Sequence, residues 1–291
     1  MQTLREMIAG DTPVLAPLAL NPLMAKMAEA AGHRALYLGG GATGYVKTVL
    51  EANLTLTEMV TAGVEIRSVT TLPLILDAAA GWGDPMHMHR TISMAEAAGF
   101  AAIEIEDQIL PKRAHHHIGI EHMIPQQLME AKIREAVAAR RGDMVIIGRT
   151  NAVRASGMDD ALRRAEGYRE AGADMVLLSP RDASEARHIG QRLAPPLLYL
   201  CSQGGLASIG LTLMEMHGLG FRLLVDTSTP LLAAYEAMAA VYRELAEGFS
   251  ITSRPLEDWR RLKDELHGTI GLDKLIRIEK ATVEKETVEK D

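Results

Sequence analysis

The segment Ala101-Ala-Ile-Glu-Ile-Glu106, followed by Asp107-Gln108, joins a short and mostly apolar run to acidic residues at its end. A continuous run of about four to eight such residues is typical of a strand buried on both faces, as in a parallel sheet. The acids stand where this strand ends, and the loop that follows them reaches His117. We expect the chemistry of the chain in strand-end loops, and above all in this one.

Similar runs recur along the chain, and stretches with helical character separate them. The eight predicted strands are Val14–Leu20, Ala35–Leu38, Leu72–Asp77, Ala101–Glu106, Met144–Arg149, Met175–Ser179, Leu197–Cys201 and Phe221–Asp226. The predicted helices between them are Pro22–Ala31, Thr57–Val69, Met86–Ala98, Gln126–Arg140, Asp159–Ala171 and Ala183–Leu193. This order predicts an α/β fold, a (β/α)₈ TIM barrel, which suits a chain of 291 residues. An open doubly wound sheet fits less well, because nothing divides the chain into two halves.

The pattern changes after Pro230, where long helical stretches replace the strand–helix units. We expect a single domain over residues 1–291, with residues 230–291 as a helical extension. Its helices are predicted at Leu231–Gly248, Leu256–His267 and Leu275–Asp291. The last eleven residues, 281–291, form a small Lys/Glu repeat that is expected to fray. Helices beyond a closed barrel commonly cover one of its ends or pack on a neighbouring subunit.

Composition excludes several classes of protein. The net charge is −7 and the isoelectric point about 5.8, which argues against nucleic acid or an anionic membrane as the main partner. The single cysteine, Cys201, excludes a disulfide framework and a cysteine-based zinc site. No basic segment with an apolar run opens the sequence, and no apolar stretch reaches the roughly 18 residues of a membrane span. We therefore expect a cytoplasmic protein.

Polar residues gather where the third, fourth and fifth predicted strands end. They are Asp77, then Glu106 and Asp107, then Arg149-Thr150-Asn151. In a barrel these ends share the face that carries active sites. Carboxylates there can hold Mg²⁺ or Mn²⁺ through waters, and an arginine beside them can bind a substrate carboxylate. Any single acid could instead cap a helix or pair with an arginine. For the set as a whole, we favour a functional role.

The second predicted strand is followed by Gly39-Gly40-Gly41-Ala-Thr-Gly44, which matches a dinucleotide-binding pattern. The acid expected about 20 residues later, at the end of the next strand, is missing there, since that strand ends only at Asp77. We interpret the glycines as a loop whose exposed N–H groups bind a carboxylate or enolate oxygen. A purely conformational turn is the alternative.

Six of the ten histidines lie between residues 87 and 122, and three of them are consecutive, His115 to His117. They follow Lys112 on the loop after the fourth strand, where all three cannot point inward. One or two could act as acid or base, because imidazole titrates near neutral pH. A transition-metal site made of these histidines and Glu106 is a less favoured alternative. His87 and His89 are expected on a helix surface.

Taken in order, these motifs resemble the phosphoenolpyruvate mutase/isocitrate lyase superfamily over nearly the whole chain. The segments are Gly39–Gly41, Asp77–Gly83 (similar to D-x-D-x-G-[YF]-G), Ile105–Arg113 (similar to I-E-D-Q…K-R) and Arg149–Ala152 (similar to R-T-D-A). The resemblance implies a Mg²⁺-dependent barrel acting on a small 2-oxo or 2-hydroxy acid through an enolate. It also implies C-terminal helices exchanged between the subunits of a homodimer or homotetramer.

The resemblance also implies roles for individual residues. Asp77, Glu106 and Asp107 would hold the metal. Gly39, Gly40, Gly41 and Arg149 would bind the substrate. Lys112, His115, His116 and Glu51, which takes the place of a catalytic aspartate, would serve catalysis.

Four positions depart from the superfamily pattern: Ala79 replaces an aspartate, Ala114 the lyase cysteine, Ser179 a glutamate and Leu200 an asparagine. An alanine has no titratable group, so the usual route of isocitrate or methylisocitrate cleavage lacks its acid or base. Cys201 lies on a strand far from the lyase loop in sequence, so it is a poor substitute.

The hypothesis that follows is a metal-dependent lyase or decarboxylase of a small 2-oxo or 2-hydroxy (di)carboxylic acid. His115 or His116 would deliver the proton that the missing cysteine cannot. The alternatives are a phosphonopyruvate-type enzyme that acts on a C–P bond, and a catalytically degenerate barrel that binds a metabolite. A further alternative, a nicotinamide-dependent dehydrogenase, is supported by the glycine motif alone.

Overall fold

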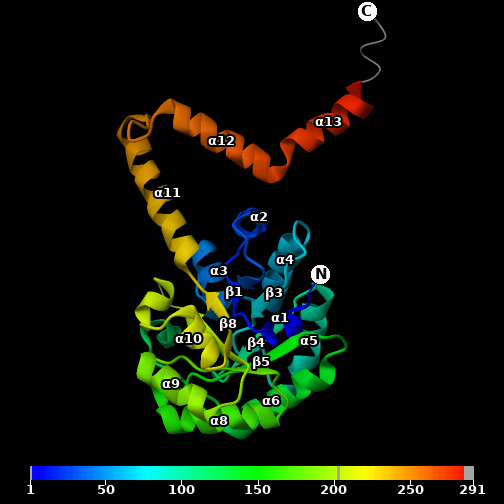
Figure 1. Cartoon of the computed structure of the whole chain (residues 1–291), viewed down its shortest axis with the longest axis vertical. Coiled ribbons are helices and arrows are strands. Elements are labelled where there is room, and N and C mark those ends of the chain that lie inside the picture. Colours follow the sequence, from blue (N-terminus) through cyan, green and yellow to red (C-terminus); the bar gives the residue numbers. More distant parts are fainter. Residues whose placement is uncertain (1, 202–203, 285–291) are drawn as a thin grey trace, which may run out of the picture. The chain divides into compact units, whose positions relative to one another are not determined.

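The computed structural model describes residues 2–201 and 204–284 (Figure 1). The chain divides into two compact units, residues 1–231 and residues 232–291. The first unit holds all the strands described, and the second is helical. No described helix combines the length and the apolar character that a membrane crossing requires.

The first unit is an eight-stranded sheet in the order β1-β8-β7-β6-β5-β4-β3-β2, with each neighbouring pair in this order parallel. Its strands are β1 Val14–Ala16, β2 Leu36–Leu38, β3 Leu74–Asp77, β4 Ala102–Glu106, β5 Val145–Arg149, β6 Met175–Leu177, β7 Leu197–Cys201 and β8 Phe221–Asp226. The sheet closes just after β1, where Leu18 bridges to Tyr37 and the Ala19 N–H donates to the Tyr37 carbonyl at 2.9 Å. The predicted barrel and its eight strands are confirmed.

Helices follow the strands and pack around them. They are α1 Leu4–Ile8, α2 Pro22–Ala30, α3 Gly40–Val46, α4 Leu56–Arg67, α5 Met88–Ala97, α6 Gln126–Ala139, α7 Ala152–Ala155, α8 Met158–Glu170, α9 Ala183–Arg192 and α10 Leu213–Gly218, with 3₁₀ turns η1 Glu51–Asn53, η2 Pro85–His87, η3 Ala114–Ile118 and η4 Gly205–Ser208. The six predicted helices of the barrel are confirmed as α2, α4, α5, α6, α8 and α9. Helices α1, α3, α7 and α10 have seven residues or fewer, too few to show a helical period in the sequence.

The side chains of each strand alternate between the inside of the barrel and the layer beneath the helices. In β4, Ala102 belongs to the inner cluster of apolar residues, while Ile103 and Ile105 belong to the outer one. All five residues of β4 are buried, which confirms the expectation from the continuous run. The alternation places Glu104 and Glu106 inside the barrel, with the next residue, Asp107, on the outer side. Which side chains of β4 face inward therefore decides which acids can meet at the strand ends.

The second unit consists of helices that leave apolar side chains exposed. Helix α11 Thr229–Gly248 begins just before this unit, and α12 Leu256–Ile270 and α13 Leu272–Thr282 follow. None of the three contains a buried residue. The predicted third helix began at Leu275 and ran to Asp291; the observed one begins earlier, and residues 285–291 lie outside the described part. Exposed apolar side chains include Tyr235, Met238, Tyr242, Leu266 and Ile270.

Candidate active site

Five charged residues meet at the carboxyl ends of the strands, and we call them the strand-end cluster: Glu51, Asp77, Glu106, Lys112 and Arg149. Lys112 Nζ donates to Glu106 Oε1 at 2.6 Å and also to Glu51 Oε2. Arg149 Nε lies 3.3 Å from Glu106 Oε2. The charge of Asp77 acts on both Glu51 and Lys112, so it belongs to the same group. Residues from four separate segments are thus brought together: Asp77, Glu106 and Arg149 were expected at these strand ends, and Glu51 and Lys112 join them.

Asp77 fixes the start of α3 through the glycine segment. Its Oδ2 accepts the Gly40 N–H at 3.0 Å, and its Oδ1 accepts the Ala79 N–H at 3.0 Å. A Cβ on Gly40 would lie 2.8 Å from Glu51 Cδ, a distance at which a side chain does not fit. The prediction of an open loop with exposed N–H groups is therefore wrong, because Gly39 caps a helix and Gly40 begins it. Both residues are buried.

Burial and charge set the protonation of this cluster. Burial, together with the charge of Asp77, raises the pKa of Glu51 to about 8. Burial also acts to raise the pKa of Glu106, but Lys112 and Arg149 outweigh it and hold that pKa below its usual range. Burial acts to lower the pKa of Lys112, but the negative charges of Glu106 and Glu51 outweigh it and raise that pKa. Lys112 and Glu106 therefore form the charged pair, and Glu51 can carry a proton near neutral pH.

Glu104 and Tyr37 form a second buried layer inside the barrel that the sequence analysis missed. Arg149 Nη1 donates to Glu104 Oε1 at 2.8 Å, and the Tyr37 hydroxyl donates to Glu104 Oε2 at 3.1 Å. Burial, with the nearby charge of Asp77, raises the pKa of Glu104 to about 7. Arg149 also donates to Asn151 Oδ1 at 3.1 Å. The guanidinium is thus positioned by three residues of the protein itself.

Asp107 points to the other side of the sheet and does not join the cluster. Its Oδ2 accepts from the Thr150 hydroxyl at 2.7 Å and the Tyr168 hydroxyl at 2.8 Å, and Arg164 Nη1 lies 3.2 Å away. Its Oδ1 accepts the Asn151 N–H at 3.1 Å. Both oxygens are therefore engaged between the strands and α8. The structure does not assemble the predicted metal set of Asp77, Glu106 and Asp107.

No three His, Cys, Asp or Glu side chains in residues 2–201 and 204–284 are grouped so that they could hold a metal ion on their own. We still favour a cation that has waters among its ligands, because the strand-end cluster offers carboxylate oxygens. The less favoured transition-metal site is not assembled either, since the histidines do not converge on Glu106.

The three consecutive histidines point in different directions from the loop of residues 109–122, which we call the histidine loop. His115 Nδ1 lies 3.2 Å from His122 Nε2. His116 Nδ1 lies 2.7 Å from Glu121 Oε2 and also contacts Gln108. His117 Nδ1 lies 3.1 Å from the Tyr45 hydroxyl. The loop is closed at its base, where the Ile109 N–H donates to the His122 carbonyl at 2.8 Å.

A cavity of about 460 Å³ opens beside Arg149, among the loops that follow β5 to β8. Arg154 and Arg181 line it, and Arg181 Nε donates to Glu185 Oε1 at 2.8 Å. Cys201 also lines it, and burial raises the pKa of this thiol to about 12, so the thiol is protonated at neutral pH. Its other lining residues are Thr150, Asn151, Val153, Ser179, Pro180, Leu200, Ser208 and Thr227. The cavity therefore leaves open space beside Arg149.

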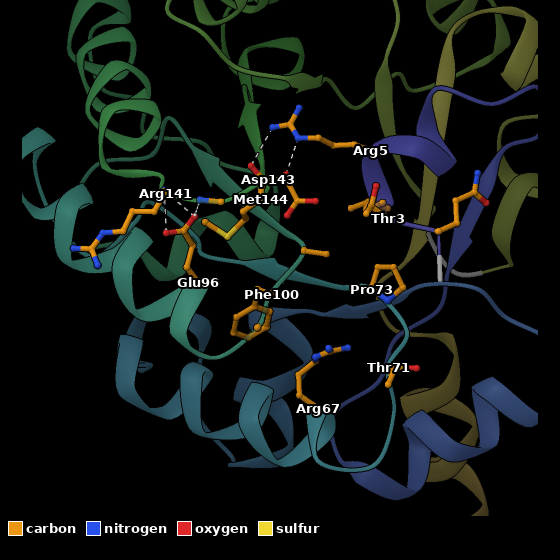
Figure 2. A pocket seen from close by; sticks show the side chains of 15 residues that line it. Thr3, Arg5, Arg67, Thr71, Pro73, Glu96, Phe100, Arg141, Asp143 and Met144 are labelled. Atoms are coloured by element: carbon orange, nitrogen blue, oxygen red, sulfur yellow. Dashed lines mark hydrogen bonds between the residues drawn. The ribbon is translucent and has the colours of Figure 1, made fainter.

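A larger hollow, of about 580 Å³, lies at the opposite end of the strands (Figure 2). Two of its charged side chains are engaged with the backbone: Arg5 Nε donates to the Asp143 carbonyl at 2.6 Å, and Glu96 accepts the Gly142 N–H at 2.8 Å. None of the predicted site residues lines it. Because barrels carry their active sites at the carboxyl ends of the strands, we assign the site to the other face.

Residues 4–246 match the family of phosphoenolpyruvate phosphomutase. The chain belongs to this family. The resemblance read from the motifs is therefore confirmed. Among its relatives is a 2-methylisocitrate lyase of Aeropyrum pernix, 34% identical over 270 residues that cover 92% of this chain and 86% of the relative. A 2,3-dimethylmalate lyase of Eubacterium barkeri is 30% identical, covering 95% and 96%.

The fold of this family member is also close to solved structures. A phosphonopyruvate hydrolase in complex with oxalate and Mg²⁺ superposes with a TM-score of 0.81 at 26% identity, covering 96% of this chain and 98% of the other. The names of these relatives agree with the predicted class, an enzyme that cleaves a bond in a small carboxylate.

Two of the departures from the family pattern now have a structural setting. Ala79 has a positive φ of 45° and serves through its backbone: its N–H donates to Asp77, and its carbonyl accepts the Glu106 N–H at 2.8 Å. The missing aspartate therefore leaves the connection between β3 and β4 intact. Ala114 begins η3, so the loop keeps a regular turn where the family has its cysteine.

Proposed function

We propose that this chain is a metal-assisted carbon–carbon lyase or decarboxylase acting on a small 2-oxo or 2-hydroxy dicarboxylate through an enolate. The observation that carries the proposal is the strand-end cluster, in which Lys112 and Arg149 hold buried carboxylates at the face where barrels do their chemistry. The relatives named as lyases of methylisocitrate and dimethylmalate support the same class of reaction.

Mg²⁺ or Mn²⁺ would be held at the strand-end cluster with waters completing its ligand shell, since no three acidic side chains of the described residues are grouped to hold a metal on their own. Asp77, Glu51 and Glu106 offer the hard oxygen ligands that these cations take. Glu51 Oε1 is buried without a hydrogen-bond partner among the described residues, and a cation or its water would satisfy it. When bound, the cation supplies positive charge where the enolate oxygen develops negative charge. Asp107 then acts by holding the strand end in place rather than by binding the metal.

The chain's own residues bind and orient the substrate. Arg149, held by Glu104, Glu106 and Asn151, lines the cavity and would bind one substrate carboxylate there. Glu51, to which Lys112 also donates, would exchange a proton with a substrate hydroxyl. Gly39 and Gly41 remain the predicted backbone contacts of the enolate, since the Gly40 N–H is bonded to Asp77. Decarboxylation makes the weaker demand on the site, because only the enolate then needs a proton.

The test is an NMR assay of oxaloacetate, methylisocitrate, dimethylmalate and phosphonopyruvate, each with Mg²⁺ and with Mn²⁺. We expect turnover of at least one, and its loss in Glu106→Gln but not in Glu135→Gln, an exposed glutamate of α6. No turnover of any of the four by folded protein would overturn the proposal. Calorimetry with Mg²⁺ and oxalate then identifies a degenerate barrel, which would show no binding.

A second candidate is a phosphonopyruvate-type enzyme that acts on a C–P bond. The phosphonopyruvate hydrolase relative favours it, as does the absence of the lyase cysteine at Ala114. Phosphorus NMR separates the two, because only this reaction releases inorganic phosphate from phosphonopyruvate.

We also propose a homodimer or homotetramer in the cytoplasm, with the C-terminal helices exchanged between subunits. The support is the exposed apolar side chains of α11 to α13, which a monomer would leave in water. Light scattering on wild type and on the double variant Tyr235→Glu/Met238→Glu tests this. A monomeric wild type would contradict it.

A further inference from the structure

Tyr45 and His117 form a pair between α3 and the histidine loop, 72 residues apart in sequence. The Tyr45 hydroxyl lies 3.1 Å from His117 Nδ1, and the ring centroids are 5.8 Å apart. The other ring nitrogen, His117 Nε2, is buried and has no hydrogen-bond partner among the described residues. A buried polar atom without a partner is costly, so its position asks for an explanation. A ligand or reacting atom that meets Nε2 would provide one.

Neither neighbouring histidine shows this combination. His115 is exposed and its ring lies against His122, with centroids 5.5 Å apart. His116 is engaged by the buried carboxylate of Glu121 and by Gln108. Of the three, His117 is the histidine whose second nitrogen is both sheltered and unpartnered in the described structure.

His117 also lies within electrostatic reach of the strand-end cluster. Burial, the neighbouring His116 and the charge of Lys112 lower the pKa of His117, while Glu106 acts in the opposite direction. Lys112 and Glu106, the central ion pair of that cluster, are thus among the charges that act on the imidazole. It also follows Ala114 by three residues, on the same loop that carries the thiol in the lyase pattern.

We infer that His117, positioned by Tyr45, is the acid that protonates the enolate carbon. The inference rests on the proposed function and names the residue that completes it. Cleavage breaks a C–C bond of the substrate and leaves the electron pair on the enolate. The N–H bond at Nε2 of the imidazolium, the minor but more acidic form of a histidine whose pKa is lowered, then breaks, and its proton forms the new C–H bond. The neutral imidazole regains a proton from water. His117 takes the role that the sequence analysis gave to His115 or His116.

The experiment compares wild type with His117→Gln, His117→Asn and, as matched control, His89→Gln, an exposed histidine of α5 paired with Glu135. The first readout is exchange of the methyl hydrogens of pyruvate in D₂O with Mg²⁺, followed by proton NMR. The second is turnover of whichever compound the NMR assay identifies. We expect both His117 variants to lose about 100-fold or more in each, as for removal of a general acid, and the control to keep its rates.

A third readout does not depend on turnover. In protein labelled with ¹⁵N in histidine, Mg²⁺ and oxalate should shift the Nε2 resonance of His117 and leave that of His89 unchanged. Tyr45→Phe removes the hydroxyl that orients the ring, so the pH profile of exchange should move while the fold is kept. Circular dichroism and thermal unfolding establish that each variant is folded.

The outcomes separate the inference from the function on which it rests. If wild type neither exchanges pyruvate hydrogens nor turns over any compound, the proposed function fails and the inference with it. If wild type is active and both folded His117 variants match it, the proposed function stands and the role of His117 is wrong. An unshifted Nε2 resonance in an active protein that binds oxalate would also overturn it.

Discussion

The strand-end cluster and the histidine loop differ in how deeply their side chains are buried and in how these side chains are paired. Lys112 and Glu106 are buried and Arg149 is only slightly exposed; all three lie at or just after strand ends, and their charges balance one another. The histidine loop is partly exposed, and its side chains pair mostly with one another. Strands of a barrel hold a charged group firmly, whereas a loop can change its residues at little cost to the fold. On the proposed function, the strand ends would bind the metal and the enolate, while the loop would set the position of the acid.

The largest effect is expected at the centre of the strand-end cluster. Lys112→Met leaves buried Glu51 without a cation and Glu106 with Arg149 alone, so the unfolding free energy should fall by about 3–5 kcal/mol and activity should be lost. Arg113→Met, next along the chain and exposed, is the control and should stay within about 0.5 kcal/mol of wild type. Urea unfolding measures both. Equal stability of the two variants would mean that Lys112 is no more than a surface charge.

A second comparison separates two acids that the sequence places together. Asp77→Asn should weaken Mg²⁺ binding in the presence of oxalate about 10-fold or more, because it changes a proposed ligand. Asp107→Asn should leave that affinity nearly unchanged but cost about 1–3 kcal/mol of stability, since it alters bonds to Thr150, Tyr168 and Arg164. Calorimetry and urea unfolding give the two numbers. The reverse pattern would return Asp107 to the metal.

The alternation of side chains along β4 is enough to separate these acids from the sequence alone. Glu104 and Glu106 are two residues apart and share the inner side of the barrel, while Asp107 follows on the outer side. Treating Glu106 and Asp107 as one acidic motif hid the difference, and counting Glu104 as part of an apolar run hid a buried charge. The barrel itself was predictable, because eight continuous apolar runs leave few other arrangements.

Other features could not be predicted, because they depend on contacts between distant segments. The pairing of Lys112 with Glu51 spans 61 residues, and that of His117 with Tyr45 spans 72. Nothing in the local sequence indicates which of three consecutive histidines faces the site, since this depends on the path of η3. The glycines of α3 were interpreted as an open loop because they match a glycine-rich motif after a strand, whereas here Gly40 makes room for Glu51.

The pH dependence of stability should reveal the protonation of Glu104, which lies in the buried layer inside the barrel. Glu104 has a pKa raised by burial to about 7, so the folded protein binds a proton there that the unfolded chain has released above its ordinary pKa of about 4.3. Stability from this group is therefore present below about pH 4.3 and is lost as pH rises towards 7. The slope should be at most about 1.4 kcal/mol per pH unit, and Glu104→Gln should lack this contribution. Thermal unfolding of metal-free protein between pH 5 and 8 measures it; parallel curves for the two proteins would contradict it.

The smallest effect is expected at the edge of the cavity, on the side away from the buried charges. Arg154 is exposed, stands on α7 and lines the cavity into which a substrate held at Arg149 would extend. If it contacts a second carboxylate through solvent, Arg154→Gln should raise KM for a dicarboxylate about 3- to 10-fold and leave kcat unchanged. The same variant should not alter KM for a monocarboxylate, nor thermal stability, because an exposed arginine adds little to the fold. Arg187→Gln, an exposed arginine of α9 outside the lining, serves as control. An equal rise of KM for both kinds of substrate would show that Arg154 acts by general attraction of anions, and that the cavity does not select for a second carboxylate.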